Sequence, residues 1–233
     1  MSTITTKNKL IPYALPFELF AKWLDEAKQV KGEKWPNAMT LATATKDGMP
    51  SARTILMQRH KVGAIGWYTN YNSRKGCEIE ENPRAALLFY WNQLERQVRF
   101  EGKVIKASKE ESDEYFATRP KESRIASIAS QQSQVLEGGL EQLKQEVDQV
   151  RSQFVVKNDD KNNSNDDGGD VVLGDVPRPE DRMGMYWLIP SKIEFWQDGE
   201  WRLHKRDVYE IVENKTHGDE ECLPGWKHYN LYP

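Results

Sequence analysis

The sequence predicts a mainly β protein, a closed or half-closed antiparallel barrel with peripheral helices. Several segments between residues 38 and 107 are rich in β-branched and aromatic residues, and turn-forming pairs such as Asp47-Gly48 and Asn82-Pro83 separate them. Helical patterns are missing between most of these segments and no repeat is present, which disfavours a sheet of strand–helix–strand units. We expect a single domain over residues 1–233, since this length suits one sizeable β-rich domain.

The N-terminal region is expected to hold a flexible arm, residues 1–15, and an amphipathic helix, Pro16–Gln29. Pro16 suits the first turn of a helix, and the apolar residues after it recur at helical spacing. These residues are Phe17, Phe20, Ala21, Trp23, Leu24 and Ala27.

The next segments are expected to form an antiparallel meander that one short helix interrupts. Ser73 is a suitable N-cap for this helix, and Asn82-Pro83 ends it after Glu81. The expected strands are Ala38–Thr45, Ala52–Gln58, Ala64–Thr69, Ala85–Trp91 and Gln97–Ala107.

Two further helices are expected after the meander. Ser108-x-x-Glu111 is a capping-box pattern that begins the first, and the Arg119-Pro120 step should end it. The second, Glu137–Phe154, has an apolar stripe opposite a charged face, so we expect an exposed helix packed on the barrel.

An acidic insertion is expected over residues 157–175. Asn158–Asp170 consists almost wholly of Asn, Asp, Lys, Ser and Gly. Such a segment cannot bury enough apolar surface to order itself, so we expect it to be disordered.

The C-terminal residues 185–233 are expected to complete the barrel. Met185–Gln197 and Trp201–Val212 have strand character on either side of the turn pair Asp198-Gly199, which is typical of a hairpin. Gly225–Pro233 resembles a last strand.

Composition and charge exclude several classes of function. The net charge of −3 disfavours a sequence-independent grip on nucleic acid. No run approaches the roughly 20 apolar residues of a membrane-spanning helix, and Met1–Leu10 lacks a signal or transit pattern, so we expect a cytoplasmic protein. Cys77 and Cys222 have neither CxxC spacing nor a neighbouring His cluster, so no disulfide scaffold and no metal site is expected.

The segment from Tyr68 to Lys75 is a candidate phosphate site. It places the hydroxyls of Thr69 and Ser73 and the cations of Arg74 and Lys75 between a strand end and a helix start. Backbone N–H groups and the helix dipole favour an anion there, and Arg and Lys both bind phosphate. A solvated basic turn is the alternative.

Two further patterns hold polar residues on presumed strands. In Arg96-Gln97-Val98-Arg99, Gln97 faces opposite to Val98 and would bind the edge of a planar polar ring or face water. Arg202, His204 and Arg206 alternate onto one face of the second hairpin strand. Three such groups together indicate either a bound anion or a structural role.

These segments together resemble the pyridoxamine 5'-phosphate oxidase family from about Pro36 to Pro233. The resemblance depends on many motifs in a fixed order, which makes chance similarity implausible. They are Arg53-Thr54-Ile55-Leu56, Tyr68-Thr69-Asn70-Tyr71-Asn72-Ser73-Arg74-Lys75-Gly76, Asn82-Pro83-Arg84-Ala85-Ala86-Leu87, Leu94-Glu95-Arg96-Gln97-Val98-Arg99, Tyr115-Phe116-Ala117-Thr118-Arg119-Pro120, Ser130-Gln131-Gln132-Ser133, Ile193-Glu194-Phe195-Trp196-Gln197 and Arg202-Leu203-His204.

The resemblance implies an FMN-binding split β-barrel that works as a homodimer, with residues 185–233 in its dimerisation region and the site shared between subunits. It implies oxidation of pyridoxamine or pyridoxine 5'-phosphate to pyridoxal 5'-phosphate, with O₂ as acceptor and hydrogen peroxide as product. Arg202 and His204 would be catalytic, over the substrate ring. The implied substrate-binding residues are Gln58, Tyr115, Arg119, Ser123, Arg202 and His204. The implied FMN-binding residues are Arg53, Ile55, Leu56, Tyr68, Thr69, Ser73, Arg74, Lys75, Gln132 and Ser133, with Gln97, Trp196 and Arg206 across the dimer interface.

The chain departs from the family pattern on the substrate side. Gln58 stands where the family usually has a phosphate-binding lysine, and Lys205 stands where it has an aspartate. Arg124–Ile128, Met183–Trp187 and Asn230 also differ from the usual residues. Two alternatives therefore stay open: a diverged flavin-binding relative with another substrate or none, and a cofactor carrier whose acidic insertion recruits a partner.

Overall fold

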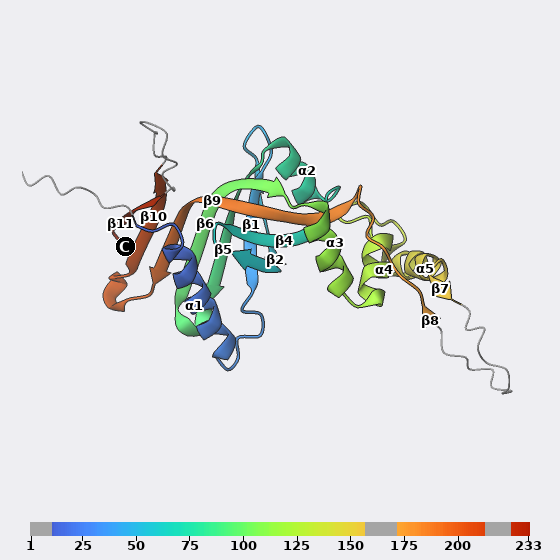
Figure 1. Ribbon diagram of the computed structural model, residues 1–233, viewed down its shortest axis with the longest axis horizontal. Helices are drawn as coiled ribbons and strands as arrows, with labels where there is room; N and C mark the ends of the chain where they lie inside the picture. The colour runs from blue at the N-terminus through green and yellow to red at the C-terminus, as the bar shows by residue number, and fades with distance from the viewer. Residues whose placement is uncertain (1–10, 157–171, 213–224) are drawn as a thin grey trace, which may run out of the picture. The chain divides into compact units, whose positions relative to one another are not determined.

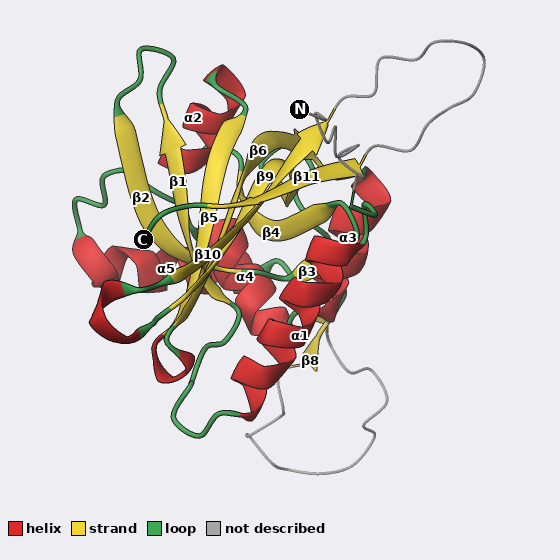
Figure 2. Ribbon diagram, turned by 90° about the vertical axis from the view of Figure 1, so that its left-hand side faces the viewer, coloured by secondary structure: helices red, strands yellow, loops and turns green. Residues whose placement is uncertain are grey.

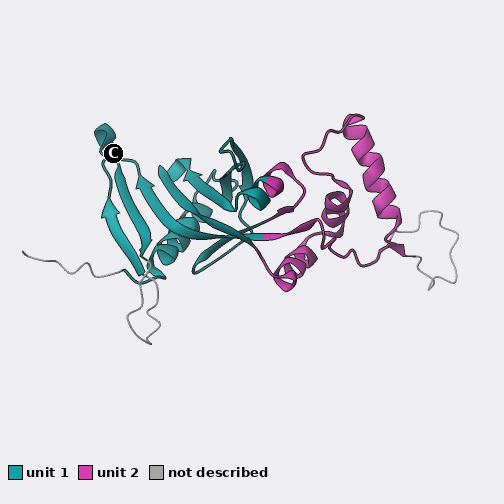
Figure 3. Ribbon diagram, turned by 90° about the horizontal axis from the view of Figure 1, so that it is seen from above, with its two compact units in different colours: residues 1–67, 78–105, 186–233 teal, residues 68–77, 106–185 magenta. Residues whose placement is uncertain are grey.

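The computed structural model describes residues 11–156, 172–212 and 225–233, and Figure 1 labels its elements. Residue contacts divide the chain into two compact units (Figure 3). The first comprises residues 1–67, 78–105 and 186–233, and the second comprises residues 68–77 and 106–185. Within the described residues, no helix is both long and apolar enough to cross a membrane.

Some of the expectations fall outside the described residues. They concern residues 1–10, most of the acidic insertion, and Cys222. The described edges of these segments are structured, since Ile11 pairs with Trp226 in a β-bridge and Leu15 begins a helix. The expectation of a single domain stays a prediction.

The described strands confirm the expected antiparallel architecture. Nine of them form one sheet with the order β11-β10-β9-β6-β5-β1-β2, in which β4 also pairs with β9 and β3 pairs with β4. The strand β3 and the pair β7–β8 were not expected. The strands of the sheet are β1 (Ala38–Ala44), β2 (Pro50–Leu56), β3 (Arg59–Lys61), β4 (Ala64–Asn70), β5 (Arg84–Trp91), β6 (Arg96–Lys106), β9 (Met183–Gln197), β10 (Lys205–Val212) and β11 (Gly225–Asn230).

Helix α1 (Leu15–Gln29) lies against the sheet of the first unit, as its apolar spacing predicted (Figure 2). Phe20 is fully buried, and its ring centroid lies 5.0 Å from those of Phe89 on β5 and Phe100 on β6. Burial of large side chains of this kind stabilises the fold by about 1.5–3 kcal/mol each. The unit therefore has an aromatic core between helix and sheet.

The second unit is mainly helical. It contains the start of α2 (Arg74–Glu81), then α3 (Lys109–Thr118), α4 (Lys121–Ala129), α5 (Gly139–Ser152) and the short strands β7 (Val155–Val156) and β8 (Val172–Leu173). Ser108 and Glu111 form the predicted capping box at the start of α3.

Two helices of the second unit differ from expectation. Helix α4 was not expected, because Pro120 was interpreted only as the end of α3. Proline is equally compatible with the start of the next helix. Helix α5 packs against α4, a neighbour that the sequence did not predict, and its expected packing on the barrel stays a prediction. Its apolar stripe is only partly covered, since Leu140 is 66% exposed.

The hairpin of β9 and β10 also differs from expectation. The 3₁₀ turn η2 (Glu200–Arg202) follows Gly199, and Trp201 and Arg202 both have positive φ, at 59° and 68°. Strand β10 therefore begins only at Lys205. Arg202 and His204 precede it, so the predicted alternation of Arg202, His204 and Arg206 on one strand face was wrong.

Asp207 links β10 to β11 and makes their stability sensitive to acid. Lys205 Nζ, His228 Nε2 and Asn230 Nδ2 lie 2.8, 3.0 and 2.9 Å from its carboxylate oxygens. Burial works to raise the pKa of the Asp207 carboxyl, but these partners outweigh burial and lower it. The ionised form therefore stabilises the fold above the ordinary carboxyl pKa, and the contribution is lost as pH falls through the lowered pKa.

We expect Asp207→Asn to lower the free energy of unfolding by about 1 kcal/mol near pH 7. The difference from wild type should shrink as pH falls below about 4, because the carboxyl of the unfolded state is protonated first and that of the native state follows at lower pH. Urea unfolding at several pH values measures this, with exposed Asp148→Asn as the matched control. A difference that persists unchanged in acid would contradict the assignment.

Candidate functional site

The junction of β4 and α2, in the second unit, gathers several of the predicted residues around Lys75. This lysine is buried, with 7% of its surface exposed. Its Nζ lies 3.1 Å from Thr69 Oγ1, 3.1 Å from Ser73 Oγ and 3.0 Å from Gln132 Oε1. Thr69 Oγ1 also lies 3.1 Å from Gln132 Oε1. We call Thr69, Ser73, Lys75 and Gln132 the Lys75 cluster.

Local backbone structure fixes the cluster. Ser73 Oγ donates to Asn70 O at 2.6 Å and accepts from the N–H of Gly76 at 3.4 Å, as an N-cap near the start of α2. A Cβ atom at Gly76 would lie 2.0 Å from the carbonyl oxygen of Tyr71, so only glycine allows this close turn. Beside Gln132, Ser133 has a φ of 74° and turns the chain sharply.

The Lys75 cluster has the chemistry of a phosphate site. It combines the buried ammonium of Lys75 with two hydroxyls that can donate hydrogen bonds. The side-chain amide of Gln132 can also donate, when it is rotated so that its NH₂ group takes the place of its oxygen. It lies at the start of a helix, where the backbone dipole favours negative charge. Arg74, next to Lys75, has an exposed side chain.

A second group in this unit surrounds Tyr68. Its ring centroid lies 5.0 Å from that of Tyr115, and the Arg119 guanidinium lies 5.8 Å from the Tyr68 ring. The Tyr68 hydroxyl is buried and makes no hydrogen bond to the described residues. Burial raises the pKa of the Tyr68 phenol, against the opposing charges of Arg178 and Arg119.

Arg119 lies at the turn between α3 and α4 and has neutral partners. Its Nη2 donates to Ser123 O at 3.3 Å, and its Nη1 donates to Ser127 Oγ at 3.3 Å. The predicted residues Tyr115, Arg119 and Ser123 thus lie in one region, although the contact with Ser123 involves its carbonyl. A guanidinium with these weak neutral partners can accept an anion as a further partner.

The sequence missed Arg124 and Ser127, which shape this turn. Arg124 donates to Ala117 O at 2.8 Å and to Arg119 O at 2.9 Å. These carbonyls lie at the end of α3, where helices leave acceptors unsatisfied. The positions of Arg124 and Ser127 in the sequence indicate a contact with Arg119 only when residues 121–129 are known to form a helix.

In the first unit, Arg53 lies on β2 with a buried carboxylate as partner. Its guanidinium donates to Thr43 Oγ1 at 2.6 Å, to Ser51 Oγ at 2.5 Å and to Glu78 Oε2 at 3.2 Å. The Glu78 carboxylate also accepts from Thr43 at 2.5 Å and from Ser51 at 2.6 Å. Sequence reasoning missed Glu78, because its partners are distant in the chain.

We expect Glu78→Gln to lower the free energy of unfolding by about 2 kcal/mol. The loss of the carboxylate leaves Arg53 and two hydroxyls with weaker acceptors inside the protein. Denaturant unfolding measures the change, and Glu81→Gln, an exposed glutamate at the end of the same helix, is the control. Equal stability of the two variants would show that the network contributes little.

The other predicted residues of β2 alternate in exposure. Ile55 shares the less exposed face with Arg53, whereas Leu56 points the other way and is 37% exposed. Gln58 is half-buried just beyond the strand, and its backbone N–H donates to Gly66 O at 2.9 Å.

A second buried carboxylate, Glu194 on β9, joins two arginines of neighbouring strands. Its Oε2 accepts from Arg99 at 2.6 Å and its Oε1 accepts from Arg206 at 2.7 Å. Glu194 itself is 3% exposed. Its position between Ile193 and Phe195 in an apolar run was the available signal, since a charge there needs a partner.

Trp196 and His204 lie together near the hairpin turn of β9 and β10. Their ring centroids are 4.8 Å apart, and His204 Nδ1 lies 2.8 Å from Asp198 Oδ1. Arg202 is exposed in η2, and Gln97 is half-buried opposite Tyr90. The resemblance implies that Arg53 binds FMN together with Arg74 and Lys75. Because Arg53 belongs to the first unit and the other two to the second, this shared role stays a prediction.

Comparison with known proteins adds the following findings. Residues 26–154 match the family model described as pyridoxamine 5'-phosphate oxidase, and residues 184–233 match that of the pyridoxine 5'-phosphate oxidase C-terminal dimerisation region. A protein of Rubrobacter xylanophilus named pyridoxine/pyridoxamine 5'-phosphate oxidase is 43% identical over 218 residues, which cover 94% of this chain and 87% of that protein. A protein of the same name from Rhodospirillum rubrum is 41% identical over 223 residues, which cover 94% of this chain and 96% of that protein.

Solved structures are similar as well. PhzG from Burkholderia lata 383, in complex with tetrahydrophenazine-1-carboxylic acid, has a TM-score of 0.75 at 27% identity, covering 100% of this chain and 98% of that chain. A pyridoxamine 5'-phosphate oxidase-related, FMN-binding protein from Nostoc punctiforme shares the fold, with a TM-score of 0.64 at 14% identity, covering 93% and 96%.

Proposed function

Because the chain belongs to the pyridoxamine 5'-phosphate oxidase family, we propose that it is an FMN-dependent oxidase of phosphorylated B6 vitamers. The proposed substrates are pyridoxamine and pyridoxine 5'-phosphate, the product is pyridoxal 5'-phosphate, and O₂ is reduced to hydrogen peroxide. The match of residues 184–233 to a dimerisation region supports a homodimer.

The Lys75 cluster is the observation that carries this proposal. Its buried ammonium and the hydroxyls of Thr69 and Ser73 suit the phosphate group of FMN, and Gln132 can donate through its amide. When bound, the flavin supplies the redox chemistry by accepting a hydride equivalent from the substrate.

The chain's own residues bind and orient the substrate in this proposal. Arg119 binds the substrate phosphate together with Tyr115 and Ser123, since its guanidinium offers donors beside two half-buried tyrosines. His204, which contacts Asp198 and the ring of Trp196, would orient the pyridine ring with Arg202. Such positioning lowers the entropic barrier of the reaction.

Spectroscopy and turnover test the proposal together. The purified protein should be yellow with FMN bound. Pyridoxamine 5'-phosphate, O₂ and water should yield pyridoxal 5'-phosphate, ammonia and hydrogen peroxide in equal amounts. A Gln58→Lys variant measured in parallel shows whether the missing charge limits substrate affinity. A colourless protein that takes up no FMN would reject the cofactor assignment.

The likeness to PhzG favours a second candidate, a flavoprotein that oxidises a reduced cyclic carboxylate. Gln58 and Lys205 alter the charge on the substrate side, and Arg119 would bind a carboxylate as readily as a phosphate. A yellow protein that is inert toward both phosphorylated vitamers and oxidises a tetrahydrophenazine carboxylic acid would favour this candidate.

A further inference from the structure

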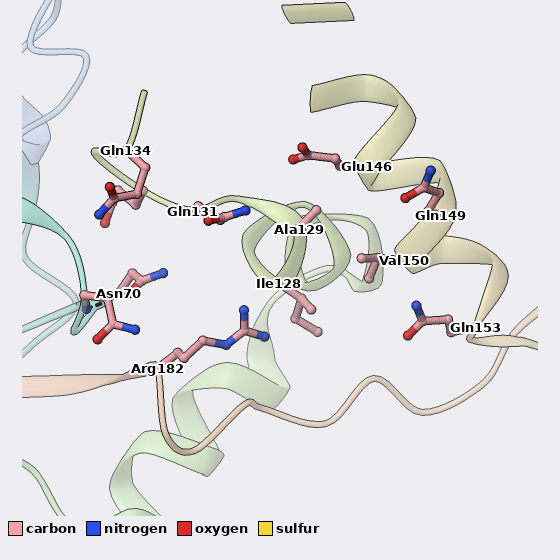
Figure 4. Close-up of a pocket in the computed structure, with 12 residues that line it drawn as sticks. Asn70, Ile128, Ala129, Gln131, Gln134, Glu146, Gln149, Val150, Gln153 and Arg182 are labelled. Carbon is pink, nitrogen blue, oxygen red and sulfur yellow. Dashed lines mark hydrogen bonds between the residues drawn. The ribbon is translucent and has the colours of Figure 1, made fainter. Parts of the chain in front are cut away.

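A pocket of about 600 Å³ lies in the second unit beside the Lys75 cluster (Figure 4). The end of α4, residues 131–134, one face of α5, and Arg182 form its walls. Its volume lies within the range of small-molecule sites. Apart from Gln132, which its wall shares with the cluster, none of the roles assigned above uses this pocket.

Amide side chains dominate its lining. Figure 4 shows Gln149 and Gln153 reaching from α5 toward the opposite wall, where Gln131 and Gln134 lie. Within the described part of the chain, the side chains of these four glutamines make no hydrogen bond. Each amide offers both donors and an acceptor, so the pocket presents a dense set of hydrogen-bonding groups available to a ligand.

The charge of the pocket is balanced. Its only charged lining residues in the described chain are Glu146 and Arg182, which carry opposite signs and lie on different walls (Figure 4). The pocket therefore offers little net electrostatic attraction to an anion, whereas the Lys75 cluster offers a positive charge. Ile128, Ala129 and Val150 add apolar surface on which a ring can lie.

We propose that this pocket binds an uncharged nitrogen heterocycle, specifically a purine base or its nucleoside. Amide side chains recognise adenine through paired donor and acceptor contacts, and the planar guanidinium of Arg182 can stack on the ring. The apolar wall replaces water at the ring face. Apart from Gln132, the lining of this pocket differs from the residues proposed for the flavin and the substrate. Its occupancy does not depend on the oxidase activity.

Calorimetric titration of FMN-saturated protein with adenosine tests the proposal. We expect saturable binding at one site per chain. Gln149→Leu and Gln153→Leu should each weaken binding about tenfold, because each removes the hydrogen bonds of one amide at nearly constant volume. Gln145→Leu, an exposed glutamine of the same helix outside the pocket, should leave affinity unchanged.

Several results would overturn the proposal. These are the absence of saturable binding, equal affinity in all three variants, or tighter binding of inorganic phosphate or adenosine 5'-phosphate than of adenosine. Loss of adenosine binding upon FMN saturation would assign the pocket to the cofactor instead. Thermal unfolding confirms that each variant is folded, and a chain that takes up no FMN is titrated as purified, which separates this test from that of the proposed function.

Discussion

Lys75→Met should weaken FMN binding about 100-fold. The substitution keeps most of the side-chain volume but removes the buried ammonium at the centre of the Lys75 cluster. A charge-assisted hydrogen bond contributes about 1.5–3 kcal/mol, and about 2.7 kcal/mol corresponds to this factor. Quenching of flavin fluorescence during titration gives both dissociation constants.

Riboflavin distinguishes a phosphate contact from a general loss of the site. It lacks the phosphate, so its affinity should be nearly the same for wild type and Lys75→Met. Lys103→Met, an exposed lysine on β6, should change neither affinity. An equal loss of affinity for FMN and riboflavin would show that Lys75 supports the site without contacting phosphate. Unchanged affinity for both would show that Lys75 does not contribute to the FMN site.

Local patterns predicted much of the fold, because they act over a few residues. The apolar spacing of Phe20 and Leu24 identified α1, and the pair Ser108 and Glu111 identified the start of α3. Runs of β-branched and aromatic residues between turn pairs identified strands such as β5 and β6. Predictions of elements and of their boundaries were wrong where one residue is compatible with two local structures. Pro120 both follows α3 and precedes α4, and the left-handed backbone at Trp201 shortened β10.

The candidate site was predictable only in part, for a related reason. Thr69, Ser73 and Lys75 are close in sequence, so their proximity followed from one strand–helix junction. The carboxylates of Glu78 on α2 and Glu194 on β9 were missed, because their arginine partners lie on other elements of the fold. The sequence positions of these glutamates and arginines do not reveal their ion pairs before the arrangement of strands and helices is known.

These two glutamates bear on how the first unit would receive a phosphorylated cofactor. Glu78 and Glu194 orient Arg53 and Arg206 through hydrogen bonds of 3.2 and 2.7 Å. An arginine held in this way loses little conformational freedom when it binds an anion, since the carboxylate already orders it. Both carboxylates also offset the positive charge, so they limit the net attraction to phosphate.

The largest effect expected on the substrate side comes from Arg119→Gln. We expect the KM for pyridoxamine 5'-phosphate to rise about 30- to 100-fold, with a much smaller change in kcat. The guanidinium binds a group remote from the reacting carbon, and its loss removes binding common to ground state and transition state. Its contacts with Ser123 and Ser127 leave N–H donors available for that phosphate.

Steady-state kinetics with two substrates decides the role of Arg119. The slow turnover of unphosphorylated pyridoxamine should be the same in wild type and Arg119→Gln, because this substrate has no phosphate for the guanidinium to bind. FMN affinity should also stay constant, which separates this residue from the Lys75 cluster. Arg151→Gln, an arginine on α5 that pairs with Glu122 and Asp148, serves as the matched control. A parallel loss of activity toward both forms of the vitamer would instead mean that Arg119 supports the turn between α3 and α4, with the phosphate bound elsewhere.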